Sequence, residues 1–208
     1  MEALSTDTLL DRAFELGMVQ IRAEIAGLVE LLRGFPLRNV MEIGSESGGT
    51  FYLWCRLAAL GGLKISLDWP AGTSGSGLYS NPRALAARAA QFYSFAPRIR
   101  VITGDSHNSW VRAKVTNALA GEQLDFLFID GDHSYEGVKQ DWNDYRGLVR
   151  PGGLVAFHDI NDSQWHRDRG CFVADFWKEF YAGPGLMVKR EFNAHLHWGG
   201  IGVVEVGS

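Results

Sequence analysis

The chain has 208 residues, 46% of them hydrophobic, so it can build one substantial core and is short for two. Its 20 basic and 24 acidic side chains give a net charge of −4, and no Lys or Arg run forms a patch that would neutralise phosphates. We therefore expect no nucleic-acid partner. No stretch is long and apolar enough to span a bilayer, so we expect no membrane partner either.

The first residues lack the basic region that leads a signal peptide. The two cysteines, Cys55 and Cys171, lie far apart and match no metal or redox spacing. Both features are typical of a reduced, cytoplasmic protein.

Helical spacing of apolar residues covers residues 5–34, where they recur at three- and four-residue steps. Gly17 is a point at which this stretch could divide into two helices, and Gly34 with Pro36 ends it. Apolar runs then predict strands at 39–44, 62–68, 98–105, 124–130, 152–159, 185–192 and 199–206. Helices are predicted at 50–60, 82–95, 109–119, 134–148 and 173–181.

Five strand–helix units followed by two closely spaced strands predict one doubly wound, Rossmann-like α/β sheet with a terminal hairpin. We expect a single domain over residues 1–208, with 1–36 as a helical extension and 37–208 as the core. In such sheets the ligand lies beyond the carboxyl ends of the strands, near the point where strand order reverses. The informative residues are therefore those that follow each strand.

Acids and glycines follow the first three predicted strands. Gly44 and Gly48 allow a tight turn after the first strand, and Glu42 is an acid within the apolar run itself. Asp68 ends the second strand, a placement that suits hydrogen bonds to the two hydroxyls of a ribose. Asp105 lies in a third polar turn at the same edge. Each feature alone also fits a plain turn, but together they favour a nucleoside pocket.

A diphosphate ligand is disfavoured, because Glu42 and Glu46 would add negative charge beside it and the turn is not GxGxxG. A P-loop is absent, since no lysine follows a glycine in the glycine-rich loop 71–77. We interpret that loop as a surface loop, with a lid over the ligand as the alternative.

The stretches VMEIGSESGGT, ISLD and VITGDS resemble the motifs of class I S-adenosylmethionine (SAM)-dependent methyltransferases. The longer stretch FIDGDHSYEGVKQDWNDYRGLVRPGGLVAFHDI resembles small-molecule O-methyltransferases of the macrocin type, together with the cephalosporin-hydroxylase-like proteins. The resemblance implies a seven-stranded, mostly parallel sheet with an antiparallel last strand and helices on both faces.

The resemblance also implies how SAM would be held. Glu42, Gly44 and Gly48 would shape the pocket for its methionine end, Asp68 would hold the ribose, and Asp105 would lie by the adenine. Because the sulfonium of SAM is positively charged, acids suit such a pocket. The expected cofactor-binding residues are Glu42, Gly44, Ser45, Gly48, Asp68, Trp69, Gly104, Asp105, Ser106 and Asp130, with Glu46 as a further contact.

Asp130 and Asp159 end the fourth and fifth strands, which this topology makes neighbours about 4.8 Å apart. Two carboxylates at that separation can share a cation such as Mg²⁺, and His133 could then act as general base. Metal-dependent members of the resembled subgroup carry an acidic pair after the fifth strand, where this chain has His158-Asp159. With Asp130, His158 and Asp159 as ligands, Mg²⁺, Mn²⁺, another transition ion or no metal all remain open.

Other roles are open for neighbouring residues. Asp132 is interpreted as the cap of the helix that begins near Ser134. His195 and His197, alternating on a predicted strand, would line an acceptor pocket with Trp198 or belong to the edge of the core.

These patterns together predict a SAM-dependent O-methyltransferase that acts on a hydroxyl of a small molecule, such as a sugar or another natural product. The alternatives are an NAD(P)-type oxidoreductase or hydroxylase-like enzyme on the same sheet, and a SAM-binding protein without turnover. The amphipathic N-terminal helices offer a surface for self-association into a homo-oligomer.

Overall fold

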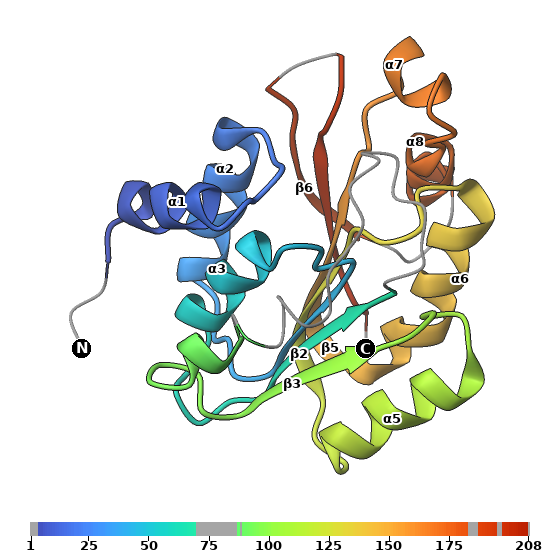
Figure 1. Cartoon of the computed structure of the whole chain (residues 1–208). Coiled ribbons are helices and arrows are strands. Elements are labelled where there is room, and N and C mark those ends of the chain that lie inside the picture. Colours follow the sequence, from blue (N-terminus) through green and yellow to red (C-terminus); the bar gives the residue numbers. More distant parts are fainter. Residues whose placement is uncertain (1–3, 70–86, 88, 183–186, 195–196, 208) are drawn as a thin grey trace.

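The computed structural model describes residues 4–69, 87, 89–182, 187–194 and 197–207 (Figure 1). Its strands are β1 Val40–Ile43, β2 Lys64–Asp68, β3 Ile99–Thr103, β4 Leu124–Ile129, β5 Val149–His158, β6 Met187–Phe192 and β7 Ile201–Glu205. They form one seven-stranded sheet in the order β3-β2-β1-β4-β5-β7-β6. The pairs from β3 to β5 are parallel, whereas β7 is antiparallel to both of its neighbours. The predicted doubly wound sheet with an antiparallel last strand is confirmed.

Helices cover both faces of the sheet (Figure 1). They are α1 Thr6–Glu15, α2 Arg22–Arg33, α3 Gly49–Leu57, α5 Ser109–Leu119, α6 Tyr135–Tyr145, α7 Gln164–Arg167, α8 Val173–Trp177 and α9 Glu179–Ala182. Successive side chains of a strand point to opposite faces. Phe126 and Phe128 of β4 therefore pack with α1, α2 and α3, while Leu127 and Ile129 pack with α5, α6 and α8.

The predicted division of the N-terminal helical stretch at Gly17 is confirmed. Gly17 has a φ of +88°, and a Cβ there would lie 2.8 Å from Oγ of Ser47. The linker between α1 and α2 thus packs closely against the turn that follows β1. Glycine is required because only it adopts this conformation at no steric cost.

Several boundaries differ from the sequence-based expectation. β5 begins at Val149, before the strand predicted at 152–159, and Gly152 within it has a φ of +71°. The helix expected at 173–181 is two short helices, α8 and α9. Asp132 is not the cap of α6: Ser134 is, and Asp132 accepts a hydrogen bond from the Ser134 N–H at 2.8 Å.

Much of the segment between β2 and β3 lies outside the described residues. This applies to the glycine-rich stretch 71–77 and to residues 82–86 and 88 of the Ala-rich helix expected at 82–95. Of the rest of that helix, residues 87 and 89–92 are helical and residues 93–95 form a turn. None of the helices among the described residues is long and apolar enough to cross a bilayer.

Strand order reverses between β1 and β4, so the switch point lies at their carboxyl ends. The two backbones approach closely there. A Cβ on Gly44, which has a φ of +85°, would lie 2.0 Å from the carbonyl oxygen of Asp130. Only glycine fits, and its absence of a side chain sets the distance between the turn after β1 and the tip of β4.

Candidate active site

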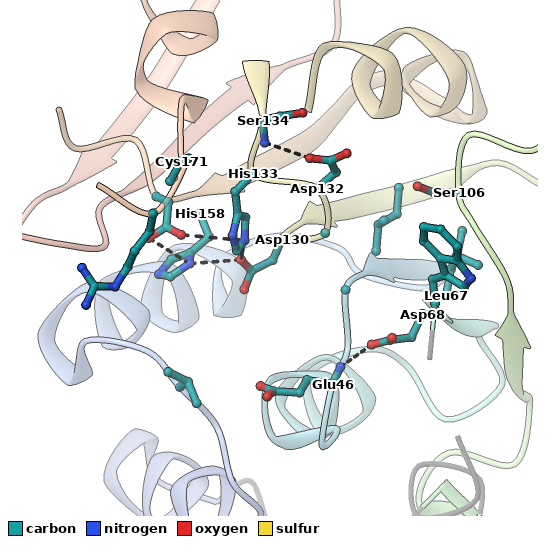
Figure 2. Close-up of a pocket in the computed structure, with 18 of the residues that line it drawn as sticks. Glu46, Leu67, Asp68, Ser106, Asp130, Asp132, His133, Ser134, His158 and Cys171 are labelled. Carbon is teal, nitrogen blue, oxygen red and sulfur yellow. Dashed lines mark hydrogen bonds and ion pairs between the residues drawn. The ribbon is translucent and has the colours of Figure 1, made fainter. Parts of the chain in front are cut away.

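A cavity of about 860 Å³ opens at the carboxyl ends of the parallel strands (Figure 2). Residues that follow all five of β1 to β5 contribute to its walls. The linker residue Val19, the segment around α7 and Trp198 complete them. The site therefore lies where the topology places it, at the switch point of the sheet.

Most of the predicted cofactor-binding residues lie in this cavity. Those that line it are Gly44, Asp68, Trp69, Gly104, Asp105, Ser106 and Asp130, and Glu46 lines it as well. Oδ2 of Asp68 accepts a hydrogen bond of 2.5 Å from the backbone N–H of Glu46 (Figure 2). This bond holds the Asp68 carboxylate against the turn after β1, with Glu46 itself at a φ of +42°.

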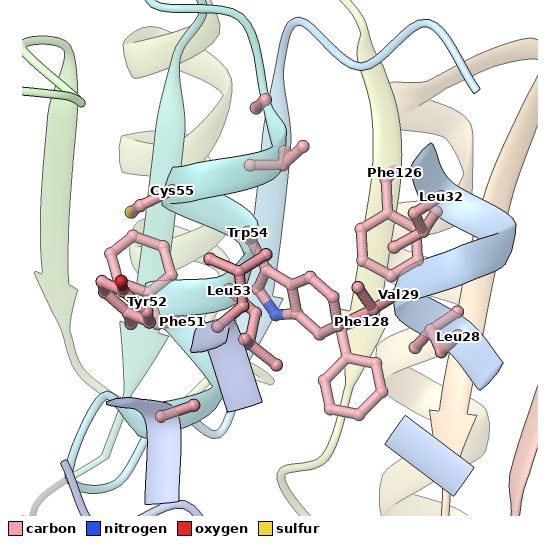
Figure 3. Packing of buried hydrophobic residues seen from close by; sticks show 14 of the residues in the cluster. Leu28, Val29, Leu32, Phe51, Tyr52, Leu53, Trp54, Cys55, Phe126 and Phe128 are labelled. Carbon is pink, nitrogen blue, oxygen red and sulfur yellow. The ribbon is translucent and has the colours of Figure 1, made fainter. Parts of the chain in front are cut away.

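Glu42, Ser45 and Gly48 do not line the cavity that the described residues form. Glu42 is fully buried, and its Oε1 accepts a 3.1 Å hydrogen bond from Nε1 of Trp54 in the core shown in Figure 3. Burial raises the pKa of Glu42 well above its ordinary value. Ser45 bonds Ser66 at 2.8 Å, and Gly48 is the N-cap of α3. The contacts predicted between these three residues and a cofactor stay predictions.

His107, which the sequence did not single out, lines the same side of the cavity as Asp105. Its Nε2 lies 3.3 Å from Oδ1 of Asp141, a fully buried carboxylate on α6. The hydrogen bond to Asp141 outweighs burial and raises the pKa of His107 to about 9. The sequence does hold one indication of this contact. Asp141 is an acid on the apolar face of a predicted helix, where a buried charge needs a partner such as His107.

Asp130, at the tip of β4, is surrounded by three hydrogen-bonding side chains. Its Oδ1 lies 3.3 Å from Nε2 of His133 and 3.1 Å from Nδ1 of His158 (Figure 2). Its Oδ2 accepts a 2.9 Å hydrogen bond from the amide of Gln20, in the linker between α1 and α2. Gln20 was missed because nothing in the local pattern links it to a residue 110 positions away.

The predicted neighbour Asp159 lies on the other side of the same histidines. Its Oδ2 is 3.8 Å from Nε2 of His133, and its Oδ1 is 3.4 Å from Nδ1 of His158. Asp159 has a φ of +62°, uncommon for a residue other than glycine and typical of functional sites. Ligand atoms of Asp130, His133 and Asp159 lie within 4.8 Å of one another, a set of oxygen and nitrogen donors that fits a divalent cation.

Charge in this cluster is strongly coupled. Burial alone would raise the pKa of Asp130, but His158 and then His133 offset it and hold the pKa below its ordinary value. Burial alone would lower the pKa of His158 and of His133, but the charges of Asp130 and Asp159 outweigh it. They raise the pKa of His158 to about 9 and also raise that of His133. Without a bound cation, the two carboxylates therefore shift both imidazoles toward their protonated form.

Aromatic and basic side chains form the other end of the cavity. Trp165 and Trp198 have ring centroids 6.0 Å apart, and the Arg169 guanidinium lies 4.1 Å from the Trp165 ring. Arg169 is the only Lys or Arg among the described residues that line the cavity. Trp198 lines the cavity, and its predicted contact with an acceptor stays a prediction. His197 lies in a bend and not in the expected strand, and His195 lies outside the described residues.

A buried carboxylate of the N-terminal helices holds the segment that carries Trp198. Glu24 on α2 accepts hydrogen bonds from the backbone N–H of Ala194 at 2.8 Å and of Gly200 at 2.7 Å. Together with Gln20, this contact joins the N-terminal segment to the site. The linker between α1 and α2 thus contributes Val19 to the walls of the cavity and Gln20 to its polar contacts.

The strand order, the antiparallel β7 and a cavity at the β1–β4 switch point define the Rossmann-like fold of class I SAM-dependent methyltransferases. The chain belongs to the family described as "Methyltransferase domain", whose model matches residues 41–160. The interpretation as a class I methyltransferase is therefore confirmed.

Solved structures share this fold at low sequence identity. The O-methyltransferase TomG of Streptomyces achromogenes, involved in tomaymycin synthesis and solved with SAM, has a TM-score of 0.66 and 17% identity, covering 100% of this chain and 92% of TomG. MycE of the mycinamycin pathway, solved with Mg, SAH and mycinamycin VI, has a TM-score of 0.66 and 17% identity, covering 99% of this chain and 55% of MycE.

A curated relative, the uncharacterized protein y4gI of Sinorhizobium fredii, is 24% identical over 176 residues. The match covers 81% of this chain and 18% of y4gI, so the chain spans less than a fifth of that relative.

Proposed function

We propose that the protein transfers a methyl group from SAM to a hydroxyl of a small molecule, with a divalent cation held between Asp130 and Asp159. The observation that carries the proposal is the position of the Asp130–His133–Asp159 group in the same cavity as Asp68. A cofactor side and a reacting side thus share one space at the switch point.

The cofactor side suits a cation better than a phosphate. Glu46, Asp68, Asp105 and Asp130 all line the cavity, and burial followed by the charges of Asp130 and Asp68 raises the pKa of Glu46. Mutual repulsion of this kind is relieved by a positively charged ligand such as a sulfonium. Asp68, fixed by the Glu46 N–H, would accept hydrogen bonds from the ribose hydroxyls.

On the reacting side, methyl transfer depends mostly on holding the acceptor oxygen in line with the methyl carbon. A bound divalent cation would bind the acceptor hydroxyl and favour its alkoxide form. Asp130 and Asp159 would hold that cation, with His133 beside it to take the hydroxyl proton. MycE, which shares the fold, was solved with Mg, and this supports the metal assignment.

The acceptor end favours a molecule with a ring. The paired indoles of Trp165 and Trp198 offer flat apolar surfaces, and the ring centroid of His158 lies 6.3 Å from that of Trp198. A sugar or an aromatic natural product stacked there would bring its hydroxyls toward the carboxylate–histidine group. Arg169 would favour an acceptor that carries a negative or strongly polar group at its far side.

The experiment is a turnover assay with SAM and a panel of hydroxylated ring compounds, preceded by calorimetric titration with SAM and with NAD⁺. We expect binding of SAM and no binding of NAD⁺; the opposite result would support the oxidoreductase alternative. A general base contributes about 10²–10⁴-fold, so His133→Ala should slow turnover at least tenfold with the affinity for SAM nearly unchanged. The control is His197→Ala, an exposed histidine outside the cavity walls. Equal turnover of the two variants would exclude His133 as the base.

A further inference from the structure

A second group of metal-ligand side chains adjoins the first and shares one residue with it. Ligand atoms of Asp159, His166 and Cys171 lie within 4.8 Å of one another. All three residues are buried, with exposed fractions of 6%, 1% and 6% respectively. A carboxylate and an imidazole, which are costly to bury without a partner, are thus gathered around a buried thiol.

Local backbone contacts bring the three together. The N–H of Cys171 donates to the carbonyl of His166 at 2.9 Å, which closes a loop at the end of α7, and Gly170 turns that loop at a φ of +71°. The next N–H, that of Phe172, donates to the carbonyl of His133 at 2.8 Å and ties the loop to the reacting side. The spacing of five residues between His166 and Cys171 is therefore set by the loop.

His166 is held at both ring nitrogens. Its Nδ1 lies 2.9 Å from Oγ of Ser163, which donates to the carbonyl of His197 at 2.5 Å, so Nδ1 carries a proton. Its Nε2 lies 3.1 Å from Oδ1 of Asp159 and 3.1 Å from the backbone nitrogen of Gly199. A metal ion bound by Nε2 and Asp159 would replace the Gly199 N–H as the partner of the Nε2 lone pair.

Asp159 has one oxygen for each group. Its Oδ1 faces His166, and its Oδ2 faces Nε2 of His133 at 3.8 Å. The two groups differ in their softest donor, because only the second contains a thiol. A sulfur ligand selects ions such as Zn²⁺, Co²⁺ or Fe²⁺ over Mg²⁺.

We propose that Asp159, His166 and Cys171 bind a transition-metal ion of the Zn²⁺ type, adjacent to the cation of the reacting side and distinct from it. Tetrahedral ligands with bonds of about 2.0–2.3 Å stand about 3.3–3.8 Å apart, so ligand atoms that lie within 4.8 Å of one another need to close by no more than about 1.5 Å. Three protein ligands leave a fourth position. Asp159 and Cys171 both line the cavity, so that position is open to a bound molecule.

The test is titration of the whole chain with Co²⁺, under a phosphine reductant free of thiols, while near-ultraviolet absorption is recorded. A cobalt–thiolate bond gives a charge-transfer band that oxygen and nitrogen ligands do not give. We expect the band in the wild type, its loss in Cys171→Ser and its retention in Cys55→Ser. Cys55 is the matched control, a buried thiol packed in the core beside Trp54 (Figure 3). Absence of the band in the wild type, or its persistence in Cys171→Ser, would overturn the proposal.

Two further variants separate this site from its neighbour. His166→Gln should lower the affinity for Co²⁺, measured from the growth of the band during titration, at least tenfold, since it removes a direct ligand. Asp130→Asn should leave the band intact, because Asp130 belongs only to the first group. Loss of the band in Asp130→Asn, in a variant whose far-ultraviolet circular dichroism is unchanged, would show one shared site and refute the second. Because the readout is a metal–sulfur bond, its outcome does not depend on the proposed methyl transfer to a hydroxyl or on the cation proposed between Asp130 and Asp159.

Discussion

Replacement of Glu24 should lower the free energy of unfolding, by an amount that follows from the two hydrogen bonds that its carboxylate accepts. The carboxylate is 1% exposed and accepts from two backbone N–H groups, those of Ala194 and Gly200. Each hydrogen bond to a charged group contributes about 1.5–3 kcal/mol, so Glu24→Ala should lower the free energy of unfolding by about 3–6 kcal/mol. Glu24→Gln keeps one acceptor oxygen and should lose about half of that.

Urea unfolding, followed by tryptophan fluorescence, measures this directly. With a denaturant dependence of about 3 kcal/mol per molar urea, Glu24→Ala should lower the midpoint by about 1–2 M. Glu30→Ala is the control, because Glu30 lies on the same helix with its side chain 62% exposed, and exposed ion pairs contribute about 0–1 kcal/mol. A Glu24→Ala midpoint as close to the wild type as that of Glu30→Ala would refute the role of the two hydrogen bonds.

Three other outcomes follow from the site. Asp68→Ala should weaken SAM binding at least tenfold in calorimetry, and unchanged affinity would contradict the ribose assignment. The folded-state pKa of His107, about 9 against an ordinary 6.5, means that its contact with Asp141 stabilises the fold fully below about pH 6.5 and is lost as pH rises through 9. The difference in urea midpoint between the wild type and His107→Gln should therefore shrink from pH 6.5 to 9.5; a constant difference would speak against it. Gln20→Leu removes a donor to Asp130 and should lower turnover about 10–100-fold at saturating SAM, a loss absent if Gln20 plays no part.

The sheet was predictable because its central strands are buried on both faces and so read as continuous apolar runs, as LDFLFID does. The order of the strands in this topology is enough to place Asp130 beside Asp159. The fine structure of β5 was not predictable in the same way. Its Pro-Gly-Gly sequence is typical of a turn, and in the structure it forms an irregularity within β5, where the pairing with β4 passes from Val149 directly to Leu154.

Partners of the site residues were harder to predict than the residues themselves. Gln20 reaches Asp130 only because the linker between α1 and α2 folds over the turn after β1. His166 lies on α7, a helix too short to show a period, and Cys171 enters the site through a loop whose geometry depends on Gly170. None of these contacts has a local sequence pattern, since each is created when distant backbone segments pack together.

The contact at Gly44 carries a consequence for how this chain can change over time. Because backbone packs directly against backbone there, the distance between the turn after β1 and the tip of β4 does not depend on how side chains repack. In a library that varies every position, the wall around Trp165 and Trp198 should accept many residues and change acceptor preference. Position 44 should accept glycine alone. The preference for an acceptor can therefore change during evolution while the relative position of the cofactor side and the reacting side of the cavity stays the same.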